Sequence, residues 1–149
     1  MKVVVQRVSE ASIEINKTIT RSMGHGYVIL LGIEEVDNSE DVDWLVSKVT
    51  KLRVFGDEEG KMNLNIKDKD GAIMIVSQFT LYASTKKGNR PSFIQAAKPA
   101  RAIPLYEEFI DKTKKSGIEV ITGEFGADMQ VSLVNDGPVT IIIDSKNRV

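Results

Sequence analysis

The stretch Gly26-Tyr27-Val28-Ile29-Leu30-Leu31-Gly32-Ile33 is a continuous apolar run. A short apolar run without alternation is typical of a strand that is buried on both faces. Residues 72–78, Ala-Ile-Met-Ile-Val-Ser-Gln, form a second run that predicts a buried strand. The first run is far too short to span a bilayer. The two runs therefore predict that the protein is organised around a β-sheet.

Weaker patterns on either side of these runs predict further strands and two helices. Alternating or β-branched residues indicate strands over residues 2–8, 11–15, 118–121, 129–134 and 139–143. Asn38 and Ser39 can cap a helix that ends near Leu52 and carries its apolar residues at helical spacing. Pro104 can open a second helix, which Gly117 closes.

The order of these elements favours one fold class. Residues 57–71 are polar and predict a long loop with room for a short strand, and residues 84–99 predict an irregular basic segment. About eight strands and two main helices that do not alternate strictly are typical of an α+β fold. We expect a single domain over residues 1–149, with a largely antiparallel, barrel-like sheet at its core.

Composition excludes several kinds of chemistry. The chain is 42% hydrophobic and 28% charged, an ordinary globular balance, and it contains no cysteine. Disulfides, thiolate nucleophiles and cysteine-bound metals are therefore excluded. The single histidine, His25, stands between two glycines and is interpreted as a turn residue, so we expect neither a bound metal nor a cofactor. The apolar run at the N-terminus is too short for a signal peptide, which favours a cytoplasmic protein without a membrane partner.

The charges are distributed unevenly. The net charge is −1, yet residues 72–106 contain no acid and five bases: Lys86, Lys87, Arg90, Lys98 and Arg101. The rest of the chain then carries 15 bases and 21 acids, a balance of −6. A local basic surface suits phosphate binding, but a solvated basic loop would show the same pattern.

Two polar motifs stand out. Ser77-Gln78-Phe79-Thr80-Leu81-Tyr82 follows a predicted buried strand, where a site can be held rigidly, although an ordinary alternating strand is the alternative. Asn135-Asp136-Gly137-Pro138-Val139-Thr140 lies between two predicted strands, and its Asp-Gly pair is a hairpin signal. A Gly-Pro bond can be cis at modest cost, which would aim the neighbouring carbonyl groups in a fixed direction.

Taken together, the two motifs resemble those of D-aminoacyl-tRNA deacylases, and the resemblance runs along nearly the whole chain. Supporting stretches are Gly88-Asn89-Arg90-Pro91-Ser92-Phe93 and Phe125-Gly126-Ala127-Asp128-Met129. The resemblance implies a homodimer with active sites at the interface. It also implies that the Gly137-Pro138 pair is cis and enters the partner's pocket, where its carbonyls hold the α-amino group and exclude an L side chain. Arg7 would lock this loop.

The resemblance also places Ser77, Gln78, Phe79 and Thr80 around the aminoacyl ester. The backbone N–H of Phe79 and the side-chain amide of Gln78 are candidate donors to the oxyanion. Thr80 is a candidate nucleophile, but a hydroxyl needs a base, and no His, Lys, Asp or Glu lies within five residues of it. The family resemblance implies instead that the 2′-hydroxyl of the RNA assists, with Thr80 as a binding or orienting group.

The basic segment has a use in this hypothesis. Lys86, Lys87 and Arg90 would contact phosphates of the aminoacyl-tRNA, and no DNA partner is expected. Two other functions stay open at this stage. One is a non-catalytic RNA-binding module, although the chain lacks an aromatic-rich RNA-stacking motif. The other is a general esterase with Thr80 or Ser77 as nucleophile, although the chain has no Gly-x-Ser-x-Gly elbow.

Overall fold

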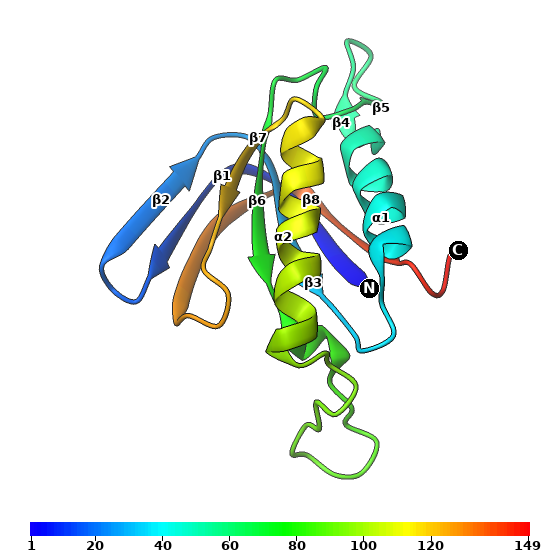
Figure 1. Ribbon diagram of the computed structural model, residues 1–149. Helices are drawn as coiled ribbons and strands as arrows, with labels where there is room; N and C mark the ends of the chain where they lie inside the picture. Colours follow the sequence, from blue (N-terminus) through cyan, green and yellow to red (C-terminus); the bar gives the residue numbers. More distant parts are fainter.

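The computed structural model describes residues 1–149 as one strongly curved sheet with two helices on one side (Figure 1). The main sheet contains six strands: β1 (Lys2–Ile15), β2 (Ile19–Met23), β3 (Gly26–Gly32), β6 (Ala72–Ser77), β7 (Glu119–Thr122) and β8 (Met129–Asp144). Their order is β2-β1-β3-β6-β7, and β8 pairs with β1. The remaining elements are β4 (Phe55–Gly56), β5 (Met62–Leu64), the short 3-10 helix η1 (Phe79–Tyr82), α1 (Ser39–Lys51) and α2 (Pro99–Lys115).

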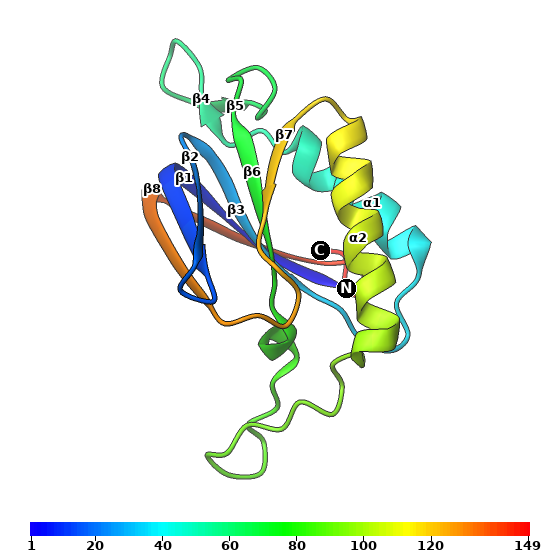
Figure 2. The ribbon, with the colours of Figure 1, turned by 60° about the vertical axis from the view of Figure 1, so that its left-hand side comes forward.

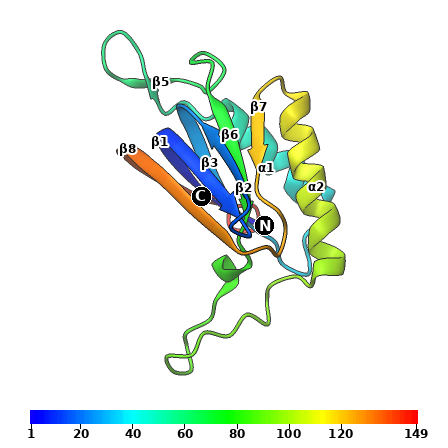
Figure 3. The same cartoon turned by 90° about the vertical axis from the view of Figure 1, so that its left-hand side faces the viewer.

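Three of the pairings in the main sheet are antiparallel and two are parallel, so the predicted α+β class with a largely antiparallel sheet is confirmed. The sheet comes close to closing into a barrel (Figure 3). Its terminal strands β2 and β7 approach each other, and Arg21 of β2 donates a hydrogen bond of 2.5 Å to the carbonyl of Thr122 at the end of β7. Neither helix combines the length and apolar character that a membrane crossing needs.

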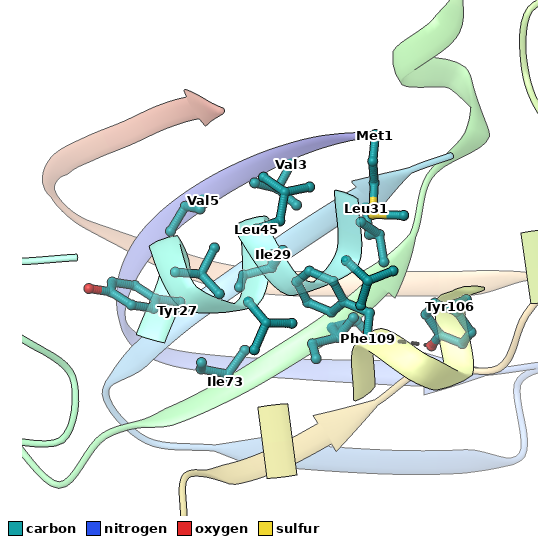
Figure 4. Packing of buried hydrophobic residues seen from close by; sticks show 14 of the residues in the cluster. Met1, Val3, Val5, Tyr27, Ile29, Leu31, Leu45, Ile73, Tyr106 and Phe109 are labelled. Atoms are coloured by element: carbon teal, nitrogen blue, oxygen red, sulfur yellow. Dashed lines mark hydrogen bonds between the residues drawn. The ribbon is translucent and has the colours of Figure 1, made fainter. Parts of the chain in front are cut away.

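The helices cover one face of the sheet (Figure 2). Figure 4 shows side chains of β1, β3 and β6 packed against Leu45 of α1 and against Tyr106 and Phe109 of α2. A second buried cluster lies on the opposite face, where the end of β1 and the start of β8 curl over β3 and β6. Because this second layer covers only part of that face, a row of paired residues, Ile142, Val4 and Leu30, keeps some exposure.

The predicted strands 2–8 and 11–15 form one strand, β1, and the predicted hairpin at Asp136-Gly137 was wrong. Residues 129–134 and 139–143 do not pair with each other; both belong to β8 and pair with β1. The register of this ladder shifts between Gln6 and Val8 and again between Val8 and Glu10. These irregularities break the period-two pattern, so sequence periodicity divides each long strand into two.

Two other boundaries differ from expectation. Strand β2 was not predicted, because all its residues except Met23 are exposed and leave no apolar pattern. Helix α2 begins at Pro99, which occupies the first helical turn, while Pro104 lies inside the helix. Helix α1 follows the prediction closely, since Asn38 caps it and forms a capping box with Asp41.

A buried ionic cluster joins the start of β1 to the segments on either side of it. The amino group of Met1 is buried and donates to Asp37 Oδ1 at 2.5 Å and to Ser145 Oγ at 3.0 Å. Ser145 and Lys146 donate in turn to Asp41. Burial alone would raise the pKa of Asp41, but hydrogen bonds from Lys146, Ser145 and the backbone of Asn38 outweigh it and lower the pKa to about 2.

Asp37→Asn should lower the free energy of unfolding by about 3–5 kcal/mol, because it leaves the buried amino group without its charge partner. Urea denaturation measures the loss. Asp43→Asn is the matched control: Asp43 also binds an amine, that of Lys112, but its side chain is 63% exposed. We expect the control to cost less than about 1 kcal/mol. Equal, small losses in both variants would contradict the stabilising role of the cluster.

Candidate functional site

The end of β6 opens into a cavity of about 350 Å³. Three segments supply most of its wall: Ser77, Gln78 and Phe79 from the β6–η1 junction, Ala97 before α2 and Ala102 in its first turn, and residues 125–129 at the entry to β8. The lining is mostly apolar with a few polar groups, among them Ser77, Gln78 and Asp128, which is the usual character of a small-molecule site. The first polar motif of the sequence therefore lies at a cavity rather than on a plain strand.

Backbone geometry turns the chain sharply at this cavity. The N–H of Gln78 donates to the carbonyl of Leu31 at 2.8 Å, and the carbonyl of Gln78 then accepts from Leu81 at 3.2 Å as η1 begins. Gly32 of β3 makes this packing possible. A Cβ atom at Gly32 would lie 3.0 Å from the Cβ of Leu81 and 3.2 Å from the carbonyl oxygen of Gln78. The close approach of η1 to β3 thus depends on a residue without a side chain.

The polar groups of the motif are arranged as donors. Phe79 is the first residue of η1, where backbone N–H groups have no partner within the helix. The side-chain amide of Gln78 donates one N–H to the hydroxyl of Thr80, and its second N–H stays available. Thr80 itself is exposed and is not part of the cavity wall.

No base contacts the Thr80 hydroxyl, whose one hydrogen-bond partner is Gln78. His25 lies at the other end of the sheet, where its Nε2 is 2.6 Å from the carbonyl oxygen of Lys69. A Ser–His or Thr–His nucleophile pair is therefore absent from this cavity. Tyr82, the last residue of η1, is buried. Its burial, together with the nearby carboxylates of Asp37 and Glu34, raises the pKa of Tyr82 well above its usual value.

The second motif forms a rigid loop on β8. One residue, Arg7, separates the paired Gln6 and Val8 of β1, whereas residues 136–139 separate their partners on β8. The three extra residues protrude, and the Gly137-Pro138 bond within them is cis. Asn135 closes the base of the loop, since its side chain accepts from the N–H of Val139 at 3.1 Å and donates to Thr140 at 3.0 Å.

Arg7 ties this loop to the body of the protein. Its Nε donates to the carbonyl of Asp136 at 3.1 Å, its Nη1 donates to the carbonyl of Val54 at 2.5 Å, and Asp136 Oδ2 lies 3.4 Å from Nε. The planar guanidinium can make these bonds in two directions at once. Gly137 has φ of +129°, and a Cβ there would lie 2.8 Å from the side chain of Val139 and 3.1 Å from Arg7 Nη2.

The two motifs do not meet within one chain. Arg7, opposite the loop, pairs with Tyr27, which pairs with Ile73 in β6; Ser77 lies four residues further along β6. Three strand spacings also separate β8 from β6 across the sheet. At about 3.3 Å per residue and about 4.8 Å per strand, the path along the curved sheet from the loop to Ser77 is roughly 20 Å. Neither Gly137, Pro138 nor Arg7 contributes to the cavity wall.

The basic residues divide into two groups. Lys86, Lys87 and Arg90 are exposed on a loop that projects beyond η1 and is closed by paired backbone hydrogen bonds between Ser84 and Ser92 (Figure 1). Lys98 and Arg101 are engaged with the loop before α1: the N–H of Lys98 donates to Glu35, and Arg101 donates to the carbonyl of Asp37. The side chain of Arg101 is therefore held against this loop, whereas the ammonium group of Lys98 is exposed like the bases of the first group.

Sequence reasoning did not assign a role to the loop before β8. Residues 125–129 line the cavity opposite Gln78, with Phe125 also packed against Tyr106 at a ring distance of 5.7 Å. The motif Phe125-Gly126-Ala127-Asp128-Met129 was noticed as part of the family resemblance, and its apolar residues beside two small ones are the signal that could have marked it as a pocket wall.

A profile of the family described as D-Tyr-tRNA(Tyr) deacylase matches residues 4–144. The chain belongs to this family. Two proteins named D-aminoacyl-tRNA deacylase, from Flavobacterium johnsoniae and Bacteroides fragilis, are 56% and 58% identical to it over 149 residues, covering 99% of each chain. Membership makes the chain an ester hydrolase of the aminoacyl-tRNA deacylase kind.

Solved structures agree on the fold. A structure titled c-Myc DNA Unwinding Element Binding Protein superposes with a TM-score of 0.89 at 40% identity, over 97% of this chain and 98% of that one. A structure of a probable eukaryotic D-amino acid tRNA deacylase superposes with a TM-score of 0.82, over 95% of this chain and 97% of that one. At 17% identity the second similarity concerns the fold alone.

Arg7→Lys should loosen the 136–139 loop, because an ammonium group cannot bond Asp136 and Val54 together. We expect the amide hydrogens of Gly137 and Val139 to exchange about tenfold faster, the effect of losing one hydrogen bond of ~1.4 kcal/mol. Hydrogen exchange measured by NMR tests this. Arg21→Lys is the control, since Arg21 also donates to a carbonyl but at Thr122. Unchanged exchange at Gly137 in Arg7→Lys would show that Arg7 does not hold the loop.

Proposed function

We propose that this protein hydrolyses the ester between a D-amino acid, or glycine, and the 3′ end of tRNA, at sites that two copies of the chain build together. One observation carries the proposal: the cavity with its hydrogen-bond donors and the protruding loop lie at different ends of the sheet, and no residue of the loop lines the cavity of its own chain. A loop held this firmly, yet remote from its own cavity, is suited to reach the cavity of a partner. The substrate chemistry follows from the family.

The proposed homodimer is supported by the surface around β8. This strand has β1 as its single partner, so its other edge is free to pair or pack. Ile142 is 70% exposed and Val134 is 49% exposed on this strand. Ile142 also lines a cleft of about 430 Å³ together with Val4 and Leu81. A two-fold interface at this face would bring each loop to the other copy and form two identical sites.

Within such a site the donors at Gln78 and Phe79 would stabilise the tetrahedral intermediate. Attack on the ester carbonyl places negative charge on its oxygen, and one fixed donor typically contributes a few kcal/mol of barrier reduction. The N–H of Phe79 and the free N–H of Gln78 are the donors in reach of the cavity. Ser77 would contact the aminoacyl group beside them. Thr80 acts through Gln78, whose amide it orients by accepting one of its hydrogens.

Selection between mirror images would come from the partner's loop. The carbonyl oxygens next to Gly137 and Pro138 would accept hydrogens from the α-amino group of the substrate. With the amine fixed there, backbone atoms occupy the space that an L side chain needs, whereas a D side chain points toward the cavity. This is discrimination by exclusion, and it does not reject glycine, which has no side chain.

The RNA would contribute to both binding and catalysis. Lys86, Lys87 and Arg90 would neutralise phosphates near the 3′ end, contacts that carry no sequence information and so suit many tRNAs. The ribose 2′-hydroxyl next to the ester would assist the attack in place of a protein base, since Thr80 has none. We place the reaction in the cytoplasm, where aminoacyl-tRNA is used. No bound metal or cofactor enters this mechanism.

The purified protein should deacylate D-tyrosyl-tRNA and glycyl-tRNA and spare L-tyrosyl-tRNA. The physical reason is that the loop excludes a side chain on one side of the chiral centre only. Release of radiolabelled amino acid measures all three rates. A general esterase would cleave both tyrosyl enantiomers, and an RNA-binding module would cleave none of the three; either outcome would overturn the proposal.

Thr80→Ala should keep substantial activity, within about tenfold of the wild type, because it removes an orienting hydrogen bond worth about 1 kcal/mol and not the nucleophile. A substrate ending in 2′-deoxyadenosine should lose most of its cleavage. Single-turnover rates on both substrates test the pair of expectations, with Thr85→Ala, an exposed threonine on the next loop, as the control. An inactive Thr80→Ala together with rapid cleavage of the deoxy substrate would make Thr80 the nucleophile.

A further inference from the structure

An exposed apolar shelf lies outside the cavity, between its rim and the basic loop. We use the name Phe93 shelf for three side chains: Phe79, Phe93 and Ile94. The side chain of Ile94 is 90% exposed and that of Phe79 is 55% exposed. Phe93, whose ring contacts that of Phe79, is partly exposed. Exposed apolar side chains that gather on a surface point to a binding surface. Phe93 and Ile94 are not part of the cavity wall, so the cavity does not account for them.

The shelf is fixed in place by its neighbours. The rings of Phe79 and Phe93 meet edge to face, with centroids 5.1 Å apart and an angle of 73°. Phe93 follows Ser92, whose N–H and carbonyl both form hydrogen bonds with the backbone of Ser84. The carbonyl of Phe93 accepts a hydrogen bond from the N–H of Ala96 at 3.0 Å. One end of the shelf therefore belongs to the cavity rim at Phe79, and the other end continues into the loop that carries the bases.

We propose that the Phe93 shelf stacks the base of the penultimate nucleotide of the unpaired tRNA 3′ end. The proposal rests on the proposed function. The terminal nucleoside with its ester would occupy the cavity, the next base would lie on the shelf, and the phosphates would pass toward Lys86, Lys87 and Arg90. Aromatic side chains beside a basic groove are the usual means of holding single-stranded nucleic acid.

The chemistry of the shelf favours this occupant. Stacking on an aromatic ring tolerates any base, so it suits an enzyme that must serve tRNAs without reading their sequence. The segment that carries the shelf and the basic loop is itself basic, since residues 72–106 contain no acid and five bases. Lys86, Lys87 and Arg90 form no ion pair within the chain. A polyanion with unpaired bases complements both properties of this surface.

A double-mutant cycle between protein and RNA tests the proposal. The substrates are a D-tyrosyl minihelix with its natural penultimate cytidine and the same minihelix with an abasic penultimate nucleotide. The proteins are the wild type and Phe93→Leu, which keeps an apolar side chain but loses the ring, with Phe93→Tyr as the conservative variant. Ile19→Ala, an exposed apolar residue on β2, is the matched control.

On the natural minihelix, Phe93→Leu should lower kcat/KM about tenfold through KM, in line with the usual strength of base–aromatic stacking. On the abasic minihelix it should have no effect, because the base that stacks is already gone. Phe93→Tyr should behave as the wild type, and Ile19→Ala should change neither substrate.

Equal losses on both minihelices would overturn the proposal, because Phe93 would then act on the cavity and not on the base. A Phe93→Leu protein that changes its mass in sedimentation would also overturn it, since the shelf would then be a contact between copies. Failure of the proposed function gives a different result: the wild type would cleave neither minihelix. Cleavage of both minihelices with additive effects would remove only the stacking proposal.

Discussion

The ladder between β1 and β8 holds three more residues on β8 than on β1 between two matched pairs, and this surplus forms the Gly137–Pro138 loop. Strand pairing continues on both sides of the surplus, so the loop is clamped at its two ends. Arg7, the one residue of β1 opposite the surplus, bonds the loop to Val54. The position of the loop is thus fixed by the sheet itself and not by local turn preference.

A loop fixed by the sheet cannot also travel to the cavity at the far end of β6. This constraint is the physical reason for proposing a dimer, since only the loop of a second copy could reach the cavity. The donors at Gln78 and Phe79 and the Gly137–Pro138 loop are each held in place by hydrogen bonds, and in one chain roughly 20 Å of sheet separates them. In a two-fold assembly this separation would allow the loop of each copy to reach the cavity of the other, because each copy carries a loop at one end and a cavity at the other. The site is then assembled from elements that do not need to move.

Much of the fold follows from local sequence patterns, and each failure has its own physical cause. The buried strands β3 and β6 and the capped helix α1 are encoded by runs of residues that are close in sequence, and their positions match the predictions. The hairpin predicted at Asp136-Gly137 fails because β1 offers a longer partner than the adjacent half of β8. Strand β2 escapes prediction because its side chains are exposed.

The candidate site was also predictable only in part: local sequence indicates one wall of the cavity, and pairings between remote strands set the rest. Ser77, Gln78 and Phe79 lie at the end of a buried strand, as their position after an apolar run indicates, and the structure places them on a cavity. Periodicity and spacing do not reveal that residues 125–129 form the opposite wall, nor that Gly137 lies far from Gln78, since both facts depend on pairings between remote strands. Thr80 was placed around the ester as a candidate nucleophile or as a binding or orienting group; in the structure it accepts a hydrogen bond from Gln78 and does not line the cavity.

Complementation between two inactive variants tests the shared site most directly. Gln78→Ala damages the cavity, and Gly137→Ala damages the loop, where a Cβ would lie 2.8 Å from Val139. In a mixed dimer, one site combines both defects and the other combines an intact cavity with an intact loop. Co-expression of the two variants should therefore restore deacylation of D-tyrosyl-tRNA to about a quarter of the wild-type rate, because random pairing makes half of the dimers mixed. A co-expressed sample no more active than the mean of the two variants would contradict a site shared between copies.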